Sequence, residues 1–131
     1  MSKLVAKGTG ASPGIVSGEL VLRSEDALER VAAGKSVILV RIETTAEDVP
    51  AMRAVAGIVT TRGGITGDAA IVARSLGKPC IAGCPPLRVD YAESVVSVWS
   101  QDEDEDDVTL RPGDMITIDG AKGEIYSGSA V

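Results

Sequence analysis

The chain has 131 residues, enough for one domain with a sizeable core, and its 13 basic and 19 acidic residues give a formal net charge of −6 at pH 7. This charge argues against nucleic-acid or anionic membrane partners, because both favour basic proteins. Nothing near the N-terminus resembles a signal peptide, and no apolar run is long enough to span a membrane. We therefore expect a cytoplasmic protein.

The first third of the chain predicts a strand and then a short helix. Residues 11–22 place Ile, Val and Leu among glycines, which is typical of a strand or a bulged hairpin. Ser24 is the predicted N-cap of the helix, and Gly34 lies just past its end. The stripe expected to face the core is Ala27, Leu28, Val31 and Ala32.

The middle of the chain predicts a parallel β-α-β-α-β series. Its strands are short apolar runs of the kind buried on both faces of a sheet: 37–40, 57–60 and 80–83. Overlapping capping boxes at Thr44 and Thr45 begin a first helix that runs through Met52. Residues 66–76 form a second helix. Its core positions are Ala69, Val72 and Ala73.

The C-terminal part predicts a β meander. Its expected strands and turn are 95–99, 108–110, the turn 111–114, 115–119 and 123–128. The acidic run 102–107 is interpreted as the solvated tip of a hairpin. Calcium binding is the alternative, although the run lacks the Gly and the spaced ligands of an EF-hand loop.

Cys80 and Cys84 are the only cysteines, and the chain contains no His. A zinc site would therefore lack its usual ligands. We interpret both residues as buried thiols, since free Cys is among the most buried residue types, and a redox pair or an exposed nucleophile is the alternative. We expect no metal and no cofactor.

The stretch TTRGGITGDAAIVAR, residues 60–74, has the pattern of an anion site. A glycine-rich turn that leaves a parallel strand and opens a helix gathers backbone N–H groups at the positive end of the helix dipole. The carboxyl ends of such strands are also where ligands bind in open α/β sheets. The predicted phosphate-binding residues are Arg62, Gly63, Gly64, Thr66 and Gly67. The plain alternative is a turn that only redirects the chain.

Four segments resemble, in the same order, the swivelling phosphohistidine domain of phosphoenolpyruvate-utilising enzymes such as pyruvate phosphate dikinase, phosphoenolpyruvate synthase and enzyme I: 8–18, 37–52, 57–84 and 113–128. The resemblance implies an α/β chain with the swivelling β/β/α fold, as a single stand-alone domain over 1–131. In that family the domain shuttles a phosphoryl group between a nucleotide-binding domain and a phosphoenolpyruvate barrel. We expect those domains to be missing, because the chain starts and stops with the swivelling unit.

The chain departs from the family at the residue that accepts the phosphoryl group. The resemblance aligns the family's Thr-Ser-His with Thr66, Gly67 and Asp68, and no other His can replace the missing one. Asp68 has three interpretations: a favourable first-turn residue, a permanent charge that resembles the phosphorylated state, or a true phosphoryl acceptor. The third usually requires a metal, and no second carboxylate cluster lies nearby in the sequence.

Together these observations predict a relative that is inactive alone and binds a protein partner, such as a nucleotide-binding or phosphoenolpyruvate-binding chain. The alternative is a phosphoryl-carrier subunit of a split dikinase-like phosphotransferase, with Asp68 as the acceptor.

Overall fold

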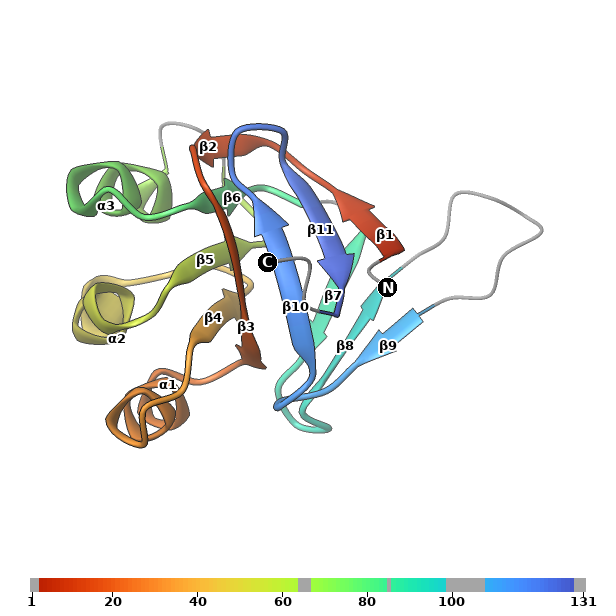
Figure 1. The fold of residues 1–131 in the computed structure, drawn as a ribbon, viewed down its shortest axis with the longest axis horizontal. Helices are drawn as coiled ribbons and strands as arrows, with labels where there is room; N and C mark the ends of the chain where they lie inside the picture. The colour runs from red at the N-terminus through yellow and green to blue at the C-terminus, as the bar shows by residue number, and fades with distance from the viewer. Residues whose placement is uncertain (1–2, 64–66, 85, 99–107, 129–131) are drawn as a thin grey trace.

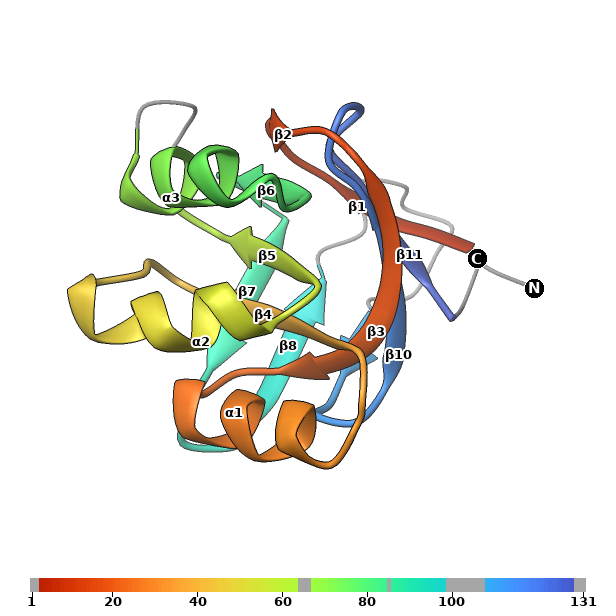
Figure 2. The ribbon, with the colours of Figure 1, turned by 60° about the vertical axis from the view of Figure 1, so that its left-hand side comes forward.

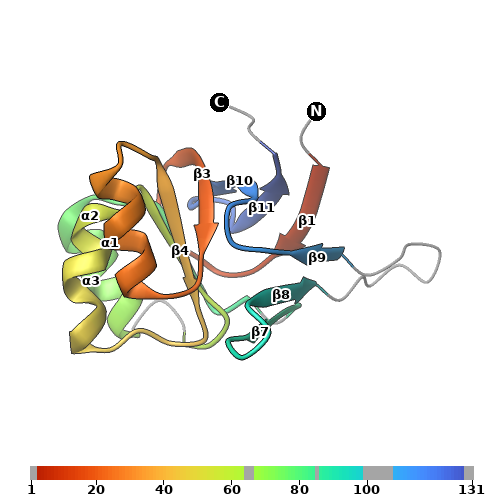
Figure 3. The same cartoon turned by 90° about the horizontal axis from the view of Figure 1, so that it is seen from below.

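The computed structural model describes residues 3–63, 67–84, 86–98 and 108–128. These residues form three layers, with the helices on one side of a large mixed sheet and a small antiparallel sheet on the other side (Figures 1 and 3). The helical elements are α1 (Ser24–Ala32), the 3-10 turn η1 (Ala46–Asp48), α2 (Val49–Ala54) and α3 (Asp68–Leu76). The α/β class predicted from the sequence is confirmed.

The large sheet has eight strands in the order β1-β11-β10-β3-β4-β5-β6-β2. Its strands are β1 (Lys3–Lys7), β2 (Gly10–Ser12), β3 (Ile15–Val21), β4 (Val37–Arg41), β5 (Gly57–Thr60), β6 (Cys80–Ala82), β10 (Met115–Asp119) and β11 (Glu124–Ser127). Strands β3 to β6 are parallel, and the other pairings are antiparallel. The predicted parallel series is confirmed and is extended by β3.

Each central strand is buried on both faces, which explains its unbroken apolar sequence. In β4, Val37 and Leu39 pack under the helices, whereas Ile38 and Val40 pack toward the small sheet. The core under the helices contains many alanines, while the core on the other face is built mainly from Val, Ile and Leu. The sequence contains no Phe, and small and branched side chains therefore build both cores.

The three helices are stacked in the order α1, α2, α3 along the sheet (Figure 2). The predicted core face of α3 is confirmed, with Ala69 and Ala73 buried and Val72 partly buried, and the helix begins at Asp68 rather than at residue 66. Helix α2 ends at Ala54, beyond the predicted Met52.

Helix α1 differs from its prediction in two respects. Its N-cap is Arg23, because Ser24 already has helical geometry and its hydroxyl donates a 2.6 Å hydrogen bond to Asp48 instead of capping the helix. The predicted core stripe is only partly correct. Ala27 is buried, but Leu28 is 42% exposed because its side of α1 faces solvent, and Ala32 is exposed as well.

The two ends of the chain form more strands than the sequence predicts. The N-terminal segment adds β1, and residues 11–22 do not form a hairpin, because β2 pairs with β6 whereas β3 pairs with β10 and β4. A C-terminal meander is present as β7 (Leu87–Asp90), β8 (Val95–Val98) and β9 (Val108–Leu110), with β7 unpredicted. The last two predicted strands, β10 and β11, instead join the large sheet. The acidic run 102–107 lies outside the described residues.

Candidate functional site

Strands β4 and β5 end side by side, so the loops that follow them share one edge of the sheet. Arg41 is in register with Thr60, and the next residues stay paired through Thr61 N–H to Arg41 O at 3.0 Å and Arg62 N–H to Ile42 O at 3.1 Å. The neighbouring loop is held through a 3.0 Å bond from Gly83 N–H to Thr60 O. This edge is where an open α/β sheet ordinarily binds its ligands.

Two glycines shape the loop that leaves β5. Gly63 has φ +94°, in the region that strongly favours glycine, although nothing lies within 4 Å of where its Cβ would be. Gly83 has φ +83°, and a Cβ there would lie 2.7 Å from the carbonyl oxygen of Gly63. The loops after β5 and β6 therefore approach each other too closely for a side chain between them.

Helix α3 begins beside this loop. Its N-cap is Gly67, in an extended conformation and without a side-chain capping bond, and the carbonyl of Gly67 accepts the first helical bond from Ile71 N–H at 3.1 Å. The first residue of the helix is Asp68, at the end where the dipole favours negative charge.

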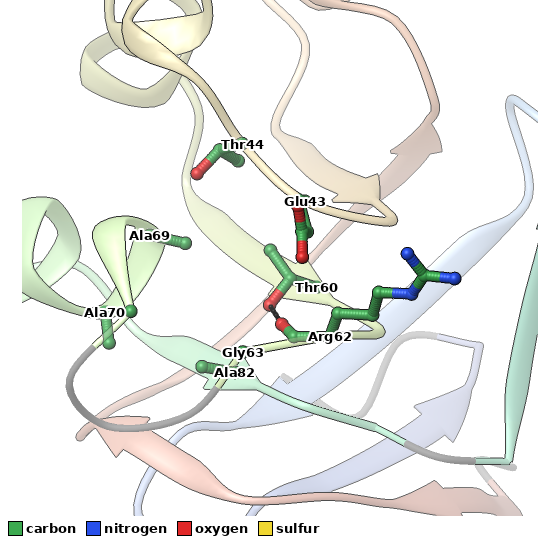
Figure 4. A pocket seen from close by; sticks show the side chains of 9 residues that line it. Glu43, Thr44, Thr60, Arg62, Gly63, Ala69, Ala70 and Ala82 are labelled. Carbon is green, nitrogen blue, oxygen red and sulfur yellow. Dashed lines mark hydrogen bonds between the residues drawn. The ribbon is translucent and has the colours of Figure 1, made fainter.

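A pocket of about 250 Å³ lies between the ends of β4 and β5 and the start of α3 (Figure 4). It is lined by Glu43, Thr44, Thr60, Arg62, Gly63, Gly67, Ala69, Ala70 and Ala82. The structure thus brings three predicted site residues together: Arg62, Gly63 and Gly67. Gly64 and Thr66 lie outside the described residues. Asp68 stands in the chain between Gly67 and Ala69, which both line the pocket.

Arg62 lines the pocket but does not direct its charge into it. Its guanidinium extends away from Ala69 and Ala70, at the start of α3 (Figure 4), and the residue is exposed. The backbone of Arg62 is fixed more firmly, since its carbonyl accepts a 2.8 Å bond from the Thr60 hydroxyl. The phosphate contact expected of Arg62 remains a prediction, and it would require a different side-chain conformation.

Sequence reasoning missed two pocket residues, Glu43 and Thr44. Thr44 was predicted as a helix cap, but the capping box uses Thr45, whose N–H donates to Asp48 Oδ2 at 2.9 Å. Thr44 is instead 8% exposed, and its hydroxyl points toward the side where α3 begins (Figure 4). The signal that would have found both residues is the adjacency of β4 and β5, which brings the residues after β4 beside the glycine loop.

A second polar cluster lies at the same edge, around the buried carboxylate of Asp48. Asp48 Oδ1 accepts the hydroxyl bond from Ser24, and Oδ2 lies 3.5 Å from Arg41 Nε. The Arg41 guanidinium stacks over the Tyr91 ring at 4.9 Å, and the Tyr91 hydroxyl accepts a 2.9 Å bond from Ile42 N–H. This cluster joins the helical layer to the small sheet.

The two thiols are unsuited to nucleophilic chemistry. Cys80 and Cys84 are both fully buried and unpaired. Burial raises the pKa of each thiol to about 12, with a small opposing effect of the Arg74 charge on the pKa of Cys80. Because only the thiolate reacts, the prediction of buried thiols is confirmed.

The described residues contain no group of three His, Cys, Asp or Glu side chains arranged to hold a metal. Within the same part of the chain, no helix combines the length and apolarity needed to cross a bilayer.

Comparisons with known proteins agree with the resemblance seen in the sequence. Residues 33–123 match the family described as "PEP-utilising enzyme, mobile domain". The chain is 46% identical over 125 residues to "Pyruvate, phosphate dikinase" of Rhizobium meliloti (strain 1021), covering 95% of this chain and 13% of that protein. It is 48% identical over 126 residues to "Pyruvate, phosphate dikinase 2" of Oryza sativa subsp. japonica, covering 96% and 13%.

Among solved structures, an NMR solution structure of Enzyme I matches with 24% identity and a TM-score of 0.47, covering 71% of this chain and 31% of that chain. The chain spans only 13% of the length of the two dikinases named above.

Proposed function

Because the chain belongs to the mobile-domain family of PEP-utilising enzymes, we propose that it is a member that binds a protein partner and carries no phosphohistidine. The proposal depends on one observation. The position where the resemblance puts the phosphoacceptor is Asp68, and the chain contains no His at all. A phosphohistidine requires an imidazole, so this chemistry has no acceptor here.

The charge of Asp68 makes it a poor replacement for that imidazole. An imidazole with pKa about 6.5 is largely neutral at pH 7, whereas an ordinary Asp carboxylate, with pKa about 3.9, is ionised. The helix dipole stabilises such a charge by roughly 0.3 to 1 kcal/mol. Two unit charges about 4 Å apart repel by about 4 kcal/mol at an effective dielectric of 20. We infer that Asp68 occupies the anion site itself and excludes phosphate.

Two features of the pocket support this inference. Gly67 provides no side-chain cap, so the backbone donors of the first turn of α3 receive no side-chain capping bond from it. Glu43 adds a second acidic residue to the pocket lining, and its charge would oppose a phosphate further. With these acidic residues the pocket would always carry negative charge, as the phosphorylated domain of the family does.

The partner we propose is a nucleotide-binding or phosphoenolpyruvate-binding chain. The dikinases of Rhizobium meliloti and rice contain the matched region as 13% of a much longer protein. We propose that this chain is cytoplasmic and docks on such a protein without transferring phosphate.

A second candidate is a phosphoryl-carrier subunit that uses Asp68 as the acceptor. It is favoured by the 46% identity to a dikinase across 95% of the chain, since most of the domain is retained around the changed residue. An aspartyl phosphate is an acyl phosphate, which hydroxylamine cleaves, and this property separates the two candidates.

Intact-mass measurement tests the proposal. The protein is incubated with phosphoenolpyruvate or ATP, alone and with a pyruvate, phosphate dikinase as donor enzyme. We expect no gain of a phosphoryl group in the wild type. Asp68→His is the matched positive control, because it restores an imidazole in the same loop. A wild-type gain that hydroxylamine removes, and that Asp68→Asn abolishes, would contradict the proposal and establish the carrier.

A further inference from the structure

A groove of about 230 Å³ lies between helix α3 on one side and the turn η1 with helix α2 on the other side. The two helices lie side by side in the helical layer (Figure 2). The wall formed by η1 and α2 includes Ala46, Val49 and Met52, and the wall formed by α3 includes Ile71 and Val72. The groove is therefore mainly apolar.

Ile71 leaves part of this apolar surface in contact with water. Its side chain is 52% exposed, whereas Met52, on the opposite wall, is 1% exposed. The alanines beside Ile71 in α3, Ala70 and Ala73, are fully buried, so Ile71 itself is not needed to fill the core. A side chain of another molecule that entered the groove would remove the apolar surface of Ile71 from water, which is favourable.

The two ends of the groove carry opposite charges. Strands β4, β5 and β6 are parallel, so α2 and α3 both begin at the edge where β4 and β5 end, and both run to the opposite edge. At the first edge, Glu43 and Glu47 are exposed, and neither forms a salt bridge within the described part of the chain. At the opposite edge, Arg53 is exposed in the last turn of α2, and the Lys78 ammonium donates to the Val55 carbonyl just past that helix.

This pattern is complementary to an amphipathic helix. A helix that binds in such a groove presents apolar side chains about one turn apart, and helices favour acidic residues in their first turn and basic residues in their last turn. If the helix lies antiparallel to α2 and α3, its acidic first turn meets Arg53 and its basic last turn meets Glu43 and Glu47. Glu47 and Arg53 are six residues apart in the chain, or about 10 Å along a helix, which equals about two turns.

The groove adjoins the pocket at the start of α3. Thr44 lines both of them, and Glu43 lines the pocket. A basic side chain that reaches Glu43 therefore contacts the pocket whose permanent negative charge is part of the proposed function. The groove and the pocket together form one surface for a protein partner.

We propose that the groove between α2 and α3 binds an amphipathic helix of the partner, antiparallel to α3, with apolar side chains against Ile71 and Met52 and a basic last turn at Glu43 and Glu47. The inference rests on the proposed function in one respect, namely that this chain has a protein partner. It adds the place where the partner binds and the chemistry of the segment that binds there.

The first test uses a synthetic probe. It is an alanine-rich peptide of about 18 residues, long enough to be helical, with glutamates in its first turn, two leucines one turn apart in its middle and lysines in its last turn. We expect saturable amide shifts centred on Ala46, Met52, Ile71 and Val72. A peptide with the lysines first and the glutamates last should bind several-fold more weakly. Equal binding of the two peptides, or shifts that spread evenly over the surface, would overturn the proposal.

Variants test the apolar contact. Ile71→Asp should weaken binding of the peptide by about tenfold or more, because it places a charge against the leucines. The matched control is Leu28→Asp, the same kind of change at a 42% exposed residue of α1 that does not line the groove. Unchanged binding in Ile71→Asp, or equal weakening in Leu28→Asp, would overturn the proposal. The dispersed amide spectrum shows that each variant is folded.

A second pair of variants tests the charge contact without changing the apolar walls. Glu47→Lys should weaken binding of the peptide by about threefold, as expected for an exposed ion pair. Glu29→Lys makes the same charge change at an exposed residue of α1 and should have a smaller effect. Equal effects would mean that the peptide is attracted only by the net charge of the protein, which would overturn the proposal.

Calorimetric titration with a pyruvate, phosphate dikinase separates this inference from the proposed function. If the dikinase binds the wild type and Ile71→Asp equally well, the groove is wrong and the partner stands. If the dikinase does not bind but the peptide binds as described, the proposed partner is wrong and the groove stands. Amide shifts of Met52 and Ile71 that change with protein concentration, without any peptide, would assign the groove to a second copy of this chain and overturn the proposal.

Discussion

Glu43 and Asp48 are two acidic residues of one loop, at the same edge of the sheet, with opposite environments. Asp48 is 6% exposed and accepts bonds from the Ser24 hydroxyl at 2.6 Å and the Thr45 N–H at 2.9 Å, beside the Arg41 guanidinium. Glu43 is exposed and lines the pocket, with no such partner among the described residues. The comparison shows that the partners of a carboxylate, rather than its place in the chain, decide whether it stabilises the fold.

The largest change in the free energy of unfolding is expected when the Asp48 charge is removed. Asp48→Asn removes the partner of Arg41, whose side chain is 23% exposed, and it disturbs the contacts to Ser24 and Thr45. We expect the free energy of unfolding to fall by about 2 to 3 kcal/mol, less than the roughly 3 to 5 kcal/mol for breaking a fully buried pair. Glu43→Gln should change it by less than about 0.5 kcal/mol. Urea denaturation measures the free energy of unfolding of both variants. Equal losses of stability would contradict the difference between Asp48 and Glu43.

The hydroxyls of Ser24 and Thr44 differ in the same way, and we expect smaller changes in stability from their removal. Ser24→Ala removes a bond to a charged acceptor and should cost about 1 to 2 kcal/mol. Thr44→Val removes a hydroxyl that makes no hydrogen bond comparable to that of Ser24 in the described part of the chain, so its effect on stability should be close to zero. A loss in Thr44→Val as large as in Ser24→Ala would mean that Thr44 is structural.

Arg62 is the second arginine at this edge of the sheet, and we expect its substitution to change stability little. Arg41 donates to the Leu22 carbonyl at 2.7 Å and stacks on Tyr91, whereas Arg62 is exposed and its guanidinium extends away from the start of α3. Arg62→Ala should change the free energy of unfolding by less than about 0.5 kcal/mol. If Arg62 nevertheless reorients to bind phosphate, Arg62→Ala should weaken phosphate binding when it is combined with Asp68→Asn.

The contrast between local and distant contacts also explains what the sequence predicts. Strands β4, β5 and β6 and helix α3 follow from apolar runs and from the glycine turn, which are local signals. Ser24 looks like a helix cap locally, but its hydroxyl bonds to Asp48, 24 residues away. Strand β7 is short and begins two residues after Pro85, so no local pattern distinguished it from a loop.

The candidate site also combines residues that the local sequence reveals with residues that only the strand pairing brings there. The glycine loop and the carboxylate at the first position of α3 are visible within 60–74, because they lie within one stretch of chain. Glu43 and Thr44 reach the pocket only because β4 pairs with β5 in the register that sets Arg41 beside Thr60. That pairing is a property of the sheet and cannot be read from either segment alone.

The central claim is that the Asp68 carboxylate occupies the anion site at the start of α3. The most direct measurement is a phosphate titration of the wild type and Asp68→Asn at constant ionic strength, followed through the Gly63 and Gly67 amide shifts. Asp68→Asn should bind phosphate and the wild type should not. The gain should stay well below the roughly 4 kcal/mol estimated for two unit charges at 4 Å, because solvent and salt screen the repulsion and Glu43 remains. A wild type that binds phosphate as tightly as Asp68→Asn would contradict the claim.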